Sequence, residues 1–155
     1  MTIIRKATTS DLDTLYQFEQ GIITAERPFD STLAHDPIHY YDLEELIRAE
    51  HIELVVAELD GKIIGSGYGR IEKSKSYLKH KYHAYLGFMF VVPEHRGEGV
   101  NQKIMAALKT WAKGKGVNEL RLEVYTNNAS AIHAYEKIGF KKHMIEMRMN
   151  LNGEN

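Results

Sequence analysis

The sequence predicts a single mixed α/β (α+β) domain, in which a twisted and mostly antiparallel sheet is flanked by helices. β-prone and amphipathic runs alternate over residues 1–155, and no linker, repeat or low-complexity segment divides them. Asp60-Gly61 stands between two β-prone runs and is a strong hairpin signal. With 43% hydrophobic and 26% charged residues, the chain has the composition of one folded domain. The expected order is β-α-(α)-β-β-β-α-β-α-β.

The first third of the chain predicts a strand, a helix and an irregular segment. Residues 2–5 are β-prone, and Ser10 is placed to cap a helix that stops at Gly21. Residues 22–42 contain two prolines and many polar and aromatic groups. They predict a long loop or a broken helix before a short helix at residues 42–50.

The remaining elements follow from hydrophobic periodicity and glycine stops. After the hairpin, a third β-prone run ends before Pro93, and the apolar spacing from Val100 to Trp111 predicts a helix ended by Gly114. A strand, a helix that stops at Gly139 and a final strand or strand pair complete the chain. The predicted ranges are 52–59, 62–72, 82–92, 100–113, 120–125, 130–138 and 140–151.

Charge and cysteine content exclude several partners and chemistries. The formal net charge is −1, so no general binding of nucleic acid or of an anionic membrane is expected. The absence of cysteine excludes disulfides, thiolate nucleophiles and thiolate metal sites. The amino terminus is too polar for a signal peptide, and we expect a cytoplasmic protein. No carboxylate cluster completes a set with the eight histidines, so no metal is expected.

A glycine-rich turn between the third long strand and the following helix is the strongest functional signal. Residues 96–101, Arg-Gly-Glu-Gly-Val-Asn, place several backbone N–H groups at the positive end of a helix dipole. Such a turn binds phosphate groups, and glycine allows the backbone to approach the anion. Val100-Asn101 does not fit a P-loop, and Gln102 does not fit a dinucleotide-binding fingerprint.

Two segments carry a family resemblance. VVPEHRGEGVNQKIMAAL, residues 91–108, and NNASAIHAYEKIGF, residues 127–140, together resemble the GNAT N-acetyltransferase family, and the expected element order agrees with it along the whole chain. One position departs from the family pattern, because Asn101 stands where the family has Gly or Ala. The matching residues are Arg96, Gly99, Asn128, Ala131, Tyr135, Gly139 and Phe140.

The resemblance implies acetyl-CoA as the co-substrate and assigns roles to both motifs. The pyrophosphate is expected on the turn, the pantetheine arm along the end of the preceding strand, and Tyr135 is expected to protonate the departing thiolate. Asn128 and Tyr135 complete the expected cofactor contacts. The turn and strand residues concerned are Met89, Phe90, Val91, Arg96, Gly97, Glu98, Gly99, Val100, Asn101 and Gln102.

The general base and the acceptor contacts are less sharply defined. Many family members carry Glu at the position that aligns with Gly87, so this chain lacks that carboxylate. Glu123 is the candidate base, and His83, Tyr85 and Glu72 remain alternatives. The irregular segment is expected to contact the acceptor. In this segment the candidate acceptor contacts are Arg27, Tyr40 and Tyr41, and the candidate carboxylates for binding an amine are Asp30, Asp36 and Asp42.

The sequence therefore predicts an N-acetyltransferase that moves an acetyl group directly to a primary amine in a ternary complex. No cysteine is available for a covalent intermediate, and no Ser-His-Asp pattern is recognised. The acceptor is a small-molecule amine or a protein amine. The alternative is a non-catalytic, acyl-CoA-binding regulatory module. The Met-rich final strand also predicts a homodimer.

Overall fold

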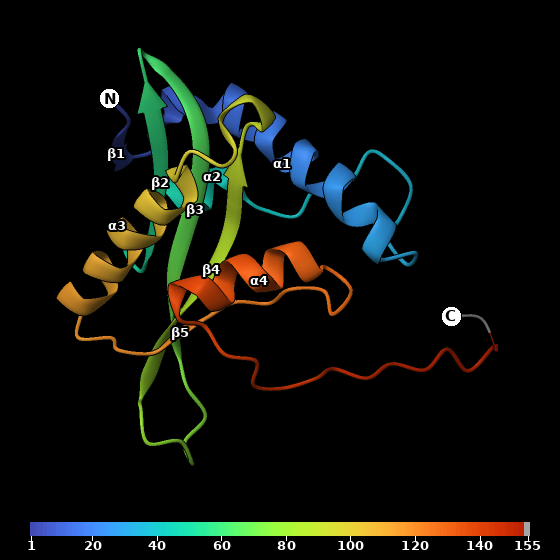
Figure 1. Ribbon diagram of the computed structural model, residues 1–155. Helices are drawn as coiled ribbons and strands as arrows, with labels where there is room; N and C mark the ends of the chain where they lie inside the picture. Colours follow the sequence, from blue (N-terminus) through green and yellow to red (C-terminus); the bar gives the residue numbers. More distant parts are fainter. Residues whose placement is uncertain (154–155) are drawn as a thin grey trace.

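The computed structural model describes residues 1–153, in which one five-stranded sheet is covered by helices on both faces (Figure 1). The strand order is β1-β2-β3-β4-β5, with antiparallel pairing up to β4 and parallel pairing between β4 and β5. The predicted fold class is confirmed. The elements are β1 (Ile3–Lys6), η1 (Thr9–Asp11), α1 (Leu12–Glu26), η2 (Arg27–Phe29), α2 (Leu43–Arg48), β2 (Ile52–Leu59), β3 (Lys62–Lys73), β4 (Tyr82–Val91), η3 (Pro93–His95), α3 (Val100–Gly114), β5 (Leu120–Arg121) and α4 (Ala129–Ile138).

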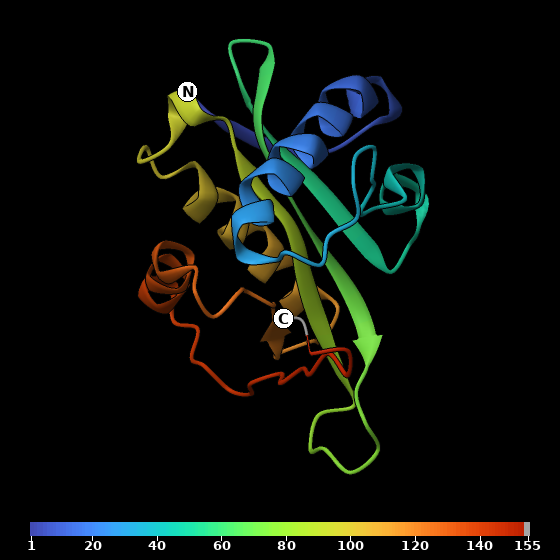
Figure 2. The same cartoon turned by 90° about the vertical axis from the view of Figure 1, so that its right-hand side faces the viewer.

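The sheet separates two hydrophobic clusters. Along β2, Leu54 and Val56 join the cluster beneath α1 and α2, whereas Val55 and Ala57 join the cluster beneath α3. This alternation is the two-residue period of a strand that is buried on both faces. Figure 2 shows α1 on the near face of the sheet and α3 behind it.

The β2–β3 hairpin forms as its sequence predicts. Asp60 and Gly61 both have positive φ angles, 51° and 79°, which suits the tight turn between the strands. The glycines that follow in β3 let α3 lie close to the sheet. A Cβ atom on Gly67 would lie 2.7 Å from the Ile104 side chain, and one on Gly69 would lie 2.8 Å from the Trp111 ring. The Gly-rich run 65–70 thus belongs to a strand that packs closely against a helix, and the pairing of β3 with β4 shifts register within it.

The predicted start and end of the first helix are both wrong. Thr8 and Asp11 form a capping box before η1, so the predicted cap at Ser10 lies inside that 3-10 turn. α1 runs through Gly21 and ends at Glu26. A Cβ atom on Gly21 would lie 2.8 Å from the Phe90 ring of β4. This glycine is therefore required by packing, which a single sequence does not distinguish from a helix stop.

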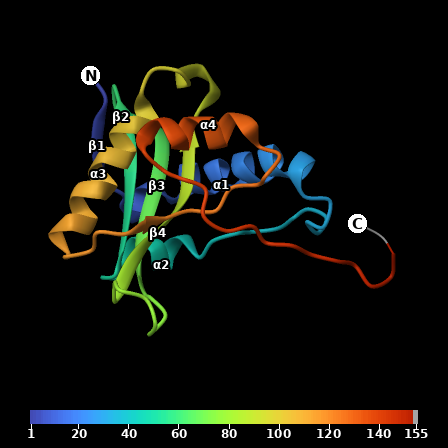
Figure 3. The same cartoon turned by 60° about the horizontal axis from the view of Figure 1, so that its bottom comes forward.

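The carboxy-terminal third departs most from the expected order. The strand predicted at residues 120–125 shortens to Leu120–Arg121. The final strand predicted at 140–151 does not form, because no strand among residues 1–153 lies beside that segment. α4 ends as predicted at Gly139, which has a φ of 118°. The chain then leaves the domain as an extended arm (Figures 1 and 3). No helix among residues 1–153 is long and apolar enough to cross a membrane.

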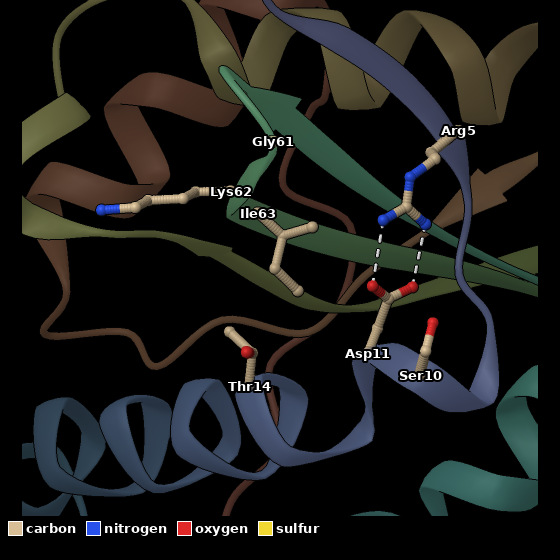
Figure 4. Close-up of a pocket in the computed structure, with 7 residues that line it drawn as sticks. All are labelled: Arg5, Ser10, Asp11, Thr14, Gly61, Lys62 and Ile63. Carbon is tan, nitrogen blue, oxygen red and sulfur yellow. Dashed lines mark hydrogen bonds and ion pairs between the residues drawn. The ribbon is translucent and has the colours of Figure 1, made fainter.

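A hollow of about 370 Å³ opens between β1, the start of α1 and the β2–β3 turn (Figure 4). Arg5 and Asp11 point toward each other across it and form two hydrogen bonds of 2.9 and 3.0 Å. The carboxylate also accepts the Thr8 amide at 2.8 Å. Because these charged groups satisfy one another, the Arg5–Asp11 pair is a structural link between β1 and the start of α1.

Replacing Asp11 with Asn should lower the free energy of unfolding by about 2 kcal/mol at neutral pH, the scale of a hydrogen bond to a charged group. The hydrogen bond from Arg5 holds the pKa of the Asp11 carboxyl below its usual range. Its contribution is therefore complete above about pH 4 and is lost as the pH falls through the lowered value. Denaturant unfolding of both proteins at neutral and acidic pH tests this. A stability difference that does not shrink in acid would contradict the ion-pair explanation.

Candidate active site

An extra residue in β4 opens the sheet at its centre. Ser66 pairs with Phe90 and Tyr68 pairs with Gly87, so β4 has one residue more than β3 across this interval. Phe88 lies in the bulge with a φ of 55°, and its displaced carbonyl accepts the Ser66 hydroxyl at 2.9 Å. A bulge shifts the alternation of side chains by one position. Leu86 accordingly faces the α3 cluster, whereas Phe88 lies in the α1 cluster.

Gly87 lies immediately before this bulge. A Cβ atom there would lie 2.6 Å from the Tyr68 hydroxyl, so the missing side chain makes room for that ring. The position at which many family members carry a carboxylate is therefore filled by an aromatic side chain from β3.

The end of β4 separates from β5. The two strands pair only at Ala84–Leu120 and Tyr85–Arg121, whereas β4 continues to Val91. Residues 122–125 follow β5 without joining a ladder within residues 1–153. At residues 89–91, β4 therefore has no ladder partner on its β5 side, and we call this break in the sheet the gap. Unpaired peptide groups on such an edge can bind an extended, amide-containing chain.

The glycine-rich turn follows directly after this open edge. Gly97 and Gly99 have φ angles of 80° and 82°, and Gly99 is the N-cap of α3. Within residues 1–153, the backbone amides from Gly97 to Gln102 have no internal carbonyl partner. These amides and the helix dipole fit an anionic group such as a pyrophosphate. Asn101, which departs from the family pattern, lies in the first turn of α3 with ordinary helical geometry.

Arg96 holds the turn against β4, and a second contact braces the turn internally. Arg96 donates from Nε to the Val91 carbonyl at 3.0 Å and lies over the Phe90 ring at 5.8 Å. His95 Nδ1 and Glu98 Oε2 are 2.8 Å apart. Arg96 thus positions the turn relative to the strand, a role that its place in the motif alone does not reveal.

Tyr135 and Asn128 belong to α4. The Asn128 side chain accepts the Ala131 amide at 3.2 Å, so it caps the helix. Tyr135 is half-buried and packs against the α3 cluster, to which Met89 and Val91 also belong. Burial, and then the negative charge of Glu26, raise the pKa of Tyr135 above its usual value. The phenol is therefore held in its protonated form.

Glu123 pairs with Tyr85 across the separating strands. The Tyr85 hydroxyl donates to Glu123 Oε1 at 3.0 Å. Burial, followed by the charge of Glu123, raises the pKa of Tyr85. The structure thus joins two residues that the sequence offered as separate base candidates.

The other two base candidates, His83 and Glu72, form a line with Ser74. Ser74 Oγ lies 2.8 Å from His83 Nδ1, and His83 Nε2 lies 3.2 Å from Glu72 Oε1. This Ser-His-acid set is not recognisable as a pattern in the sequence. Ser74 is only 7% exposed, so the line stabilises the far end of β3 and β4 and presents no open nucleophile. Among residues 1–153, no three His, Cys, Asp or Glu side chains gather in a way that could hold a metal.

A buried carboxylate fastens the segment that follows α1. Glu19 is 0% exposed and accepts the amides of Tyr40 and Tyr41, both at 2.9 Å. His39 Nδ1 lies 2.8 Å from its other oxygen. Tyr41 then packs against Phe88 with ring centroids 4.7 Å apart. Glu19 therefore ties this segment to the β4 bulge.

Most of the polar residues predicted to contact the acceptor form hydrogen bonds or ion pairs within the protein. Arg27 pairs with Asp36 at 2.7 Å, and Asp42 caps α2. Asp30 accepts the Tyr125 hydroxyl at 3.0 Å, which joins the segment to the chain after β5. The Tyr40 hydroxyl is buried and makes no hydrogen bond within residues 1–153.

Glu26, the last residue of α1, was missed by the sequence reasoning. Burial raises the pKa of its carboxyl, with a smaller opposing effect of Tyr40, which lies near it without reaching hydrogen-bond geometry. After burial, its negative charge contributes to the raised pKa values of four tyrosines, Tyr40, Tyr41, Tyr125 and Tyr135. The charge of Glu26 is therefore felt by tyrosines from α4, from the segment after α1 and from the chain after β5. Only the folded chain brings them together.

Comparison with known proteins identifies this arrangement. The sequence model of the acetyltransferase (GNAT) family matches residues 15–140, which include the bulge, the turn and Tyr135. The chain belongs to the GNAT family. It is an N-acetyltransferase that depends on acetyl-CoA, which favours the enzyme over the regulatory module.

Relatives within the family act on different amines. The aminoglycoside N(6′)-acetyltransferase type 1 of Salmonella typhimurium is 26% identical over 115 residues, covering 69% of this chain and 74% of that protein. The N-alpha-acetyltransferase of Sulfurisphaera tokodaii is 26% identical over 156 residues, covering 97% and 87%. The crystal structure of a predicted acetyltransferase with acetyl-CoA from Clostridium acetobutylicum has the same fold, with a TM-score of 0.74, 18% identity and 99% of both chains covered.

Gly99→Val should weaken binding of CoA at least about tenfold, because a β-branched residue at positive φ costs more than about 1–2 kcal/mol and distorts the turn. Affinity for pantetheine, which lacks the pyrophosphate, should change little. Calorimetric titration with both ligands measures the two effects. Gly116→Val is the matched control, since Gly116 has a φ of 75° at the other end of α3. Equal losses of affinity for CoA and for pantetheine would show that this turn does not bind the pyrophosphate.

Proposed function

We propose that this enzyme transfers the acetyl group of acetyl-CoA directly to a primary amine within a ternary complex. The observation that carries the proposal is the gap between β4 and β5, beside which lie the open amides of the turn and, in the same cluster as Met89 and Val91, Tyr135. The chain has no cysteine, and Ser74 and His83 of the line with Glu72 are buried. Direct transfer needs neither a cysteine nor a serine nucleophile.

In this proposal, main-chain groups make most of the contacts with acetyl-CoA. Acetyl-CoA supplies the activated acetyl group. The amides of residues 97–102 hold the pyrophosphate, and the open edge of Met89, Phe90 and Val91 binds the pantetheine amides. Arg96 fixes the turn to that edge through the Val91 carbonyl. The turn amides have no carbonyl partner within residues 1–153, and β4 has no ladder partner on its β5 side after Tyr85, although the Val91 carbonyl is already occupied by Arg96.

Tyr135 donates the proton that the departing sulfur requires. Its raised pKa keeps the phenol protonated at neutral pH, as a general acid must be. Its packing against the cluster that contains Met89 and Val91 holds the ring beside the path of the donor.

Glu26 is the proton acceptor that we favour, in place of Glu123. A carboxylate whose pKa is raised toward neutrality is a better general base than one fully hydrated at the surface. Glu123 is exposed and already accepts the Tyr85 hydroxyl. That pair is better suited to orienting the amine than to deprotonating it.

The acceptor is a cationic amine. Glu26 and Glu123 bring negative charge to this region, whereas Asp30 is paired with Arg148 and Arg27 with Asp36. Tyr40 and Tyr41 form the wall on the α1 side. Both amine classes of the relatives, aminoglycosides and protein N-termini, meet this requirement.

Tyr135→Phe should reduce kcat by about 100-fold or more, the usual scale for a positioned general acid. The fold and the affinity for acetyl-CoA should be kept, because only a hydroxyl is removed and the loss arises in the transition state. Steady-state kinetics with a polyamine or aminoglycoside acceptor and thermal unfolding of both proteins test this. An unchanged kcat would assign Tyr135 to packing alone.

Glu26→Gln should lower kcat/KM by about 100-fold. It should also abolish the acidic limb of the pH profile, because activity needs the carboxylate and is lost as the pH falls through its raised pKa. Glu123→Gln is the matched control and should keep that limb. If the Glu123 variant loses the limb and the Glu26 variant keeps it, the base is Glu123.

A further inference from the structure

Two hydrogen-bond donors lie close together in the middle of the sheet, on the face that α1 covers (Figure 2). Tyr68 of β3 belongs to the α1 cluster, and Arg70, two residues further along the strand, points to the same face. The Arg70 guanidinium lies over the Tyr68 ring at 5.5 Å and over the ring of Tyr85, its partner in β4, at 5.4 Å. These two rings hold the guanidinium in one place on the sheet.

The guanidinium has unused N–H groups. Its Nε donates to Glu72 at 2.8 Å, and the Arg70 side chain makes no other hydrogen bond within residues 1–153. The N–H groups of both Nη atoms are therefore without a partner in this part of the chain. The Arg70 side chain is 34% exposed, so a ligand can reach it. Two Nη atoms form the fork that binds a carboxylate through paired hydrogen bonds.

The Tyr68 hydroxyl offers another donor at the same place. Tyr68 is only 3% exposed, and its hydroxyl lies near the guanidinium without reaching hydrogen-bond geometry. Among residues 1–153, the one fully enclosed hydroxyl without a partner belongs to Tyr40, so the Tyr68 hydroxyl is open to a ligand. It lies 2.6 Å from the place of a Cβ atom on Gly87, directly before the bulge. We call Tyr68 and Arg70 the donor pair.

The carboxylates beside the donor pair leave the fork open. Glu72 accepts from Nε of Arg70, and its other oxygen lies 3.2 Å from His83 Nε2. It thus fixes the guanidinium from the edge opposite the fork. Glu123 accepts the Tyr85 hydroxyl and is exposed to water, which screens its charge. The fork therefore keeps room for one further carboxylate.

Tyr41 connects the donor pair to Glu26. The Tyr41 ring meets the Tyr68 ring edge-on, with centroids 6.0 Å apart. Burial, then Tyr68 and then the charge of Glu26 raise the pKa of Tyr41. The charge of Glu26 also contributes, after burial, to the raised pKa of Tyr135. The region beside the bulge thus has a carboxylate on the side of Tyr135 and the donor pair on the other side of Tyr41.

The spacing suits a small bifunctional molecule. The donor pair lies over Gly87, and the open edge of β4 begins at Met89. At the rise of a strand, two residues span about 7 Å. A molecule that reaches from the donor pair to the edge therefore needs its two functional groups several bonds apart.

We propose that Arg70 and Tyr68 bind a carboxylate of the acceptor, so that the preferred acceptor is an amine that also carries a carboxylate. The inference rests on the proposed transfer to a primary amine. The amine lies toward Glu26 and the carboxylate on the fork of Arg70, so the two opposite charges decide which end meets the acetyl group. Both a free amino acid with a distant amine and a peptide that begins with an acidic residue offer this chemistry.

Acceptors that differ only in this group test the proposal. One pair is δ-aminovalerate and its amide, and the other is a tripeptide amide that begins with glutamate or with glutamine. In at least one pair, the carboxylate should have the higher kcat/KM by about tenfold or more, mainly through KM, because the amide loses charge-assisted hydrogen bonds. The pair that shows the preference identifies the source of the carboxylate. Equal values within both pairs would overturn the proposal.

Two variants assign the preference to the donor pair. Arg70→Gln and Tyr68→Phe should each bring the carboxylate and its amide closer together in kcat/KM, and thermal unfolding checks that both variants fold. Arg121→Gln is the matched control, since Arg121 lies in the same row beside Tyr85 but contacts His80 and Glu119. It should keep the preference. A preference that survives Arg70→Gln but not Arg121→Gln would overturn the proposal.

Binding separates this inference from the proposed transfer. Calorimetric titration of the CoA-loaded enzyme with the same pairs measures affinity without reaction. A carboxylate preference that Arg70→Gln abolishes supports the inference, and if no acceptor is then acetylated, the proposed transfer alone fails. Acetylation without a carboxylate preference would keep the transfer and overturn the inference. A lack of binding by all four probes would also overturn it.

Discussion

The additional residue at Phe88 in β4 is the constraint on which the site depends. By shifting the alternation of β4, it sends Phe88 into the α1 cluster and leaves Met89 and Val91 on the α3 side. β4 continues past the point where β5 ends, so the two strands stop pairing and the sheet opens between them. Positive φ at a bulky residue is costly. Tight burial of the Phe88 ring and the hydrogen bond from Ser66 offset that cost.

The parts around the opening come from distant regions of the chain but are mechanically connected. Arg96 holds the turn to Val91, while Glu19 holds Tyr40 and Tyr41 against the other side of the bulge. Asp30 links the same segment to Tyr125 beyond β5. The turn on one side and the segment after α1 on the other are therefore both fixed to β4, which lies between them. This fixes the site in the absence of ligands, which lowers the entropy lost on binding.

Local patterns predicted the elements whose causes are local. The Asp60-Gly61 turn, α3 with its preceding glycines, and the stop of α4 at Gly139 depend on neighbouring residues and are confirmed. Gly21 misled the prediction because its neighbour is Phe90, far away in sequence. Glu26 was missed for the same reason, since its raised pKa arises from burial that only the folded chain provides. The final strand was predicted from a β pattern of alternating residues, but such a pattern forms a strand only beside another strand, and none pairs with this segment within residues 1–153.

The central claim is that acetyl-CoA lies between the open edge of β4 and the turn before α3. Backbone amide chemical-shift mapping during titration of the ¹⁵N-labelled protein with acetyl-CoA tests it most directly. The account predicts that the largest changes occur at residues 89–91 and 97–102, with smaller changes along α4 and none around Arg5 and Asp11. Shifts concentrated at the Arg5 hollow, or an unperturbed turn in a protein that binds acetyl-CoA, would contradict it.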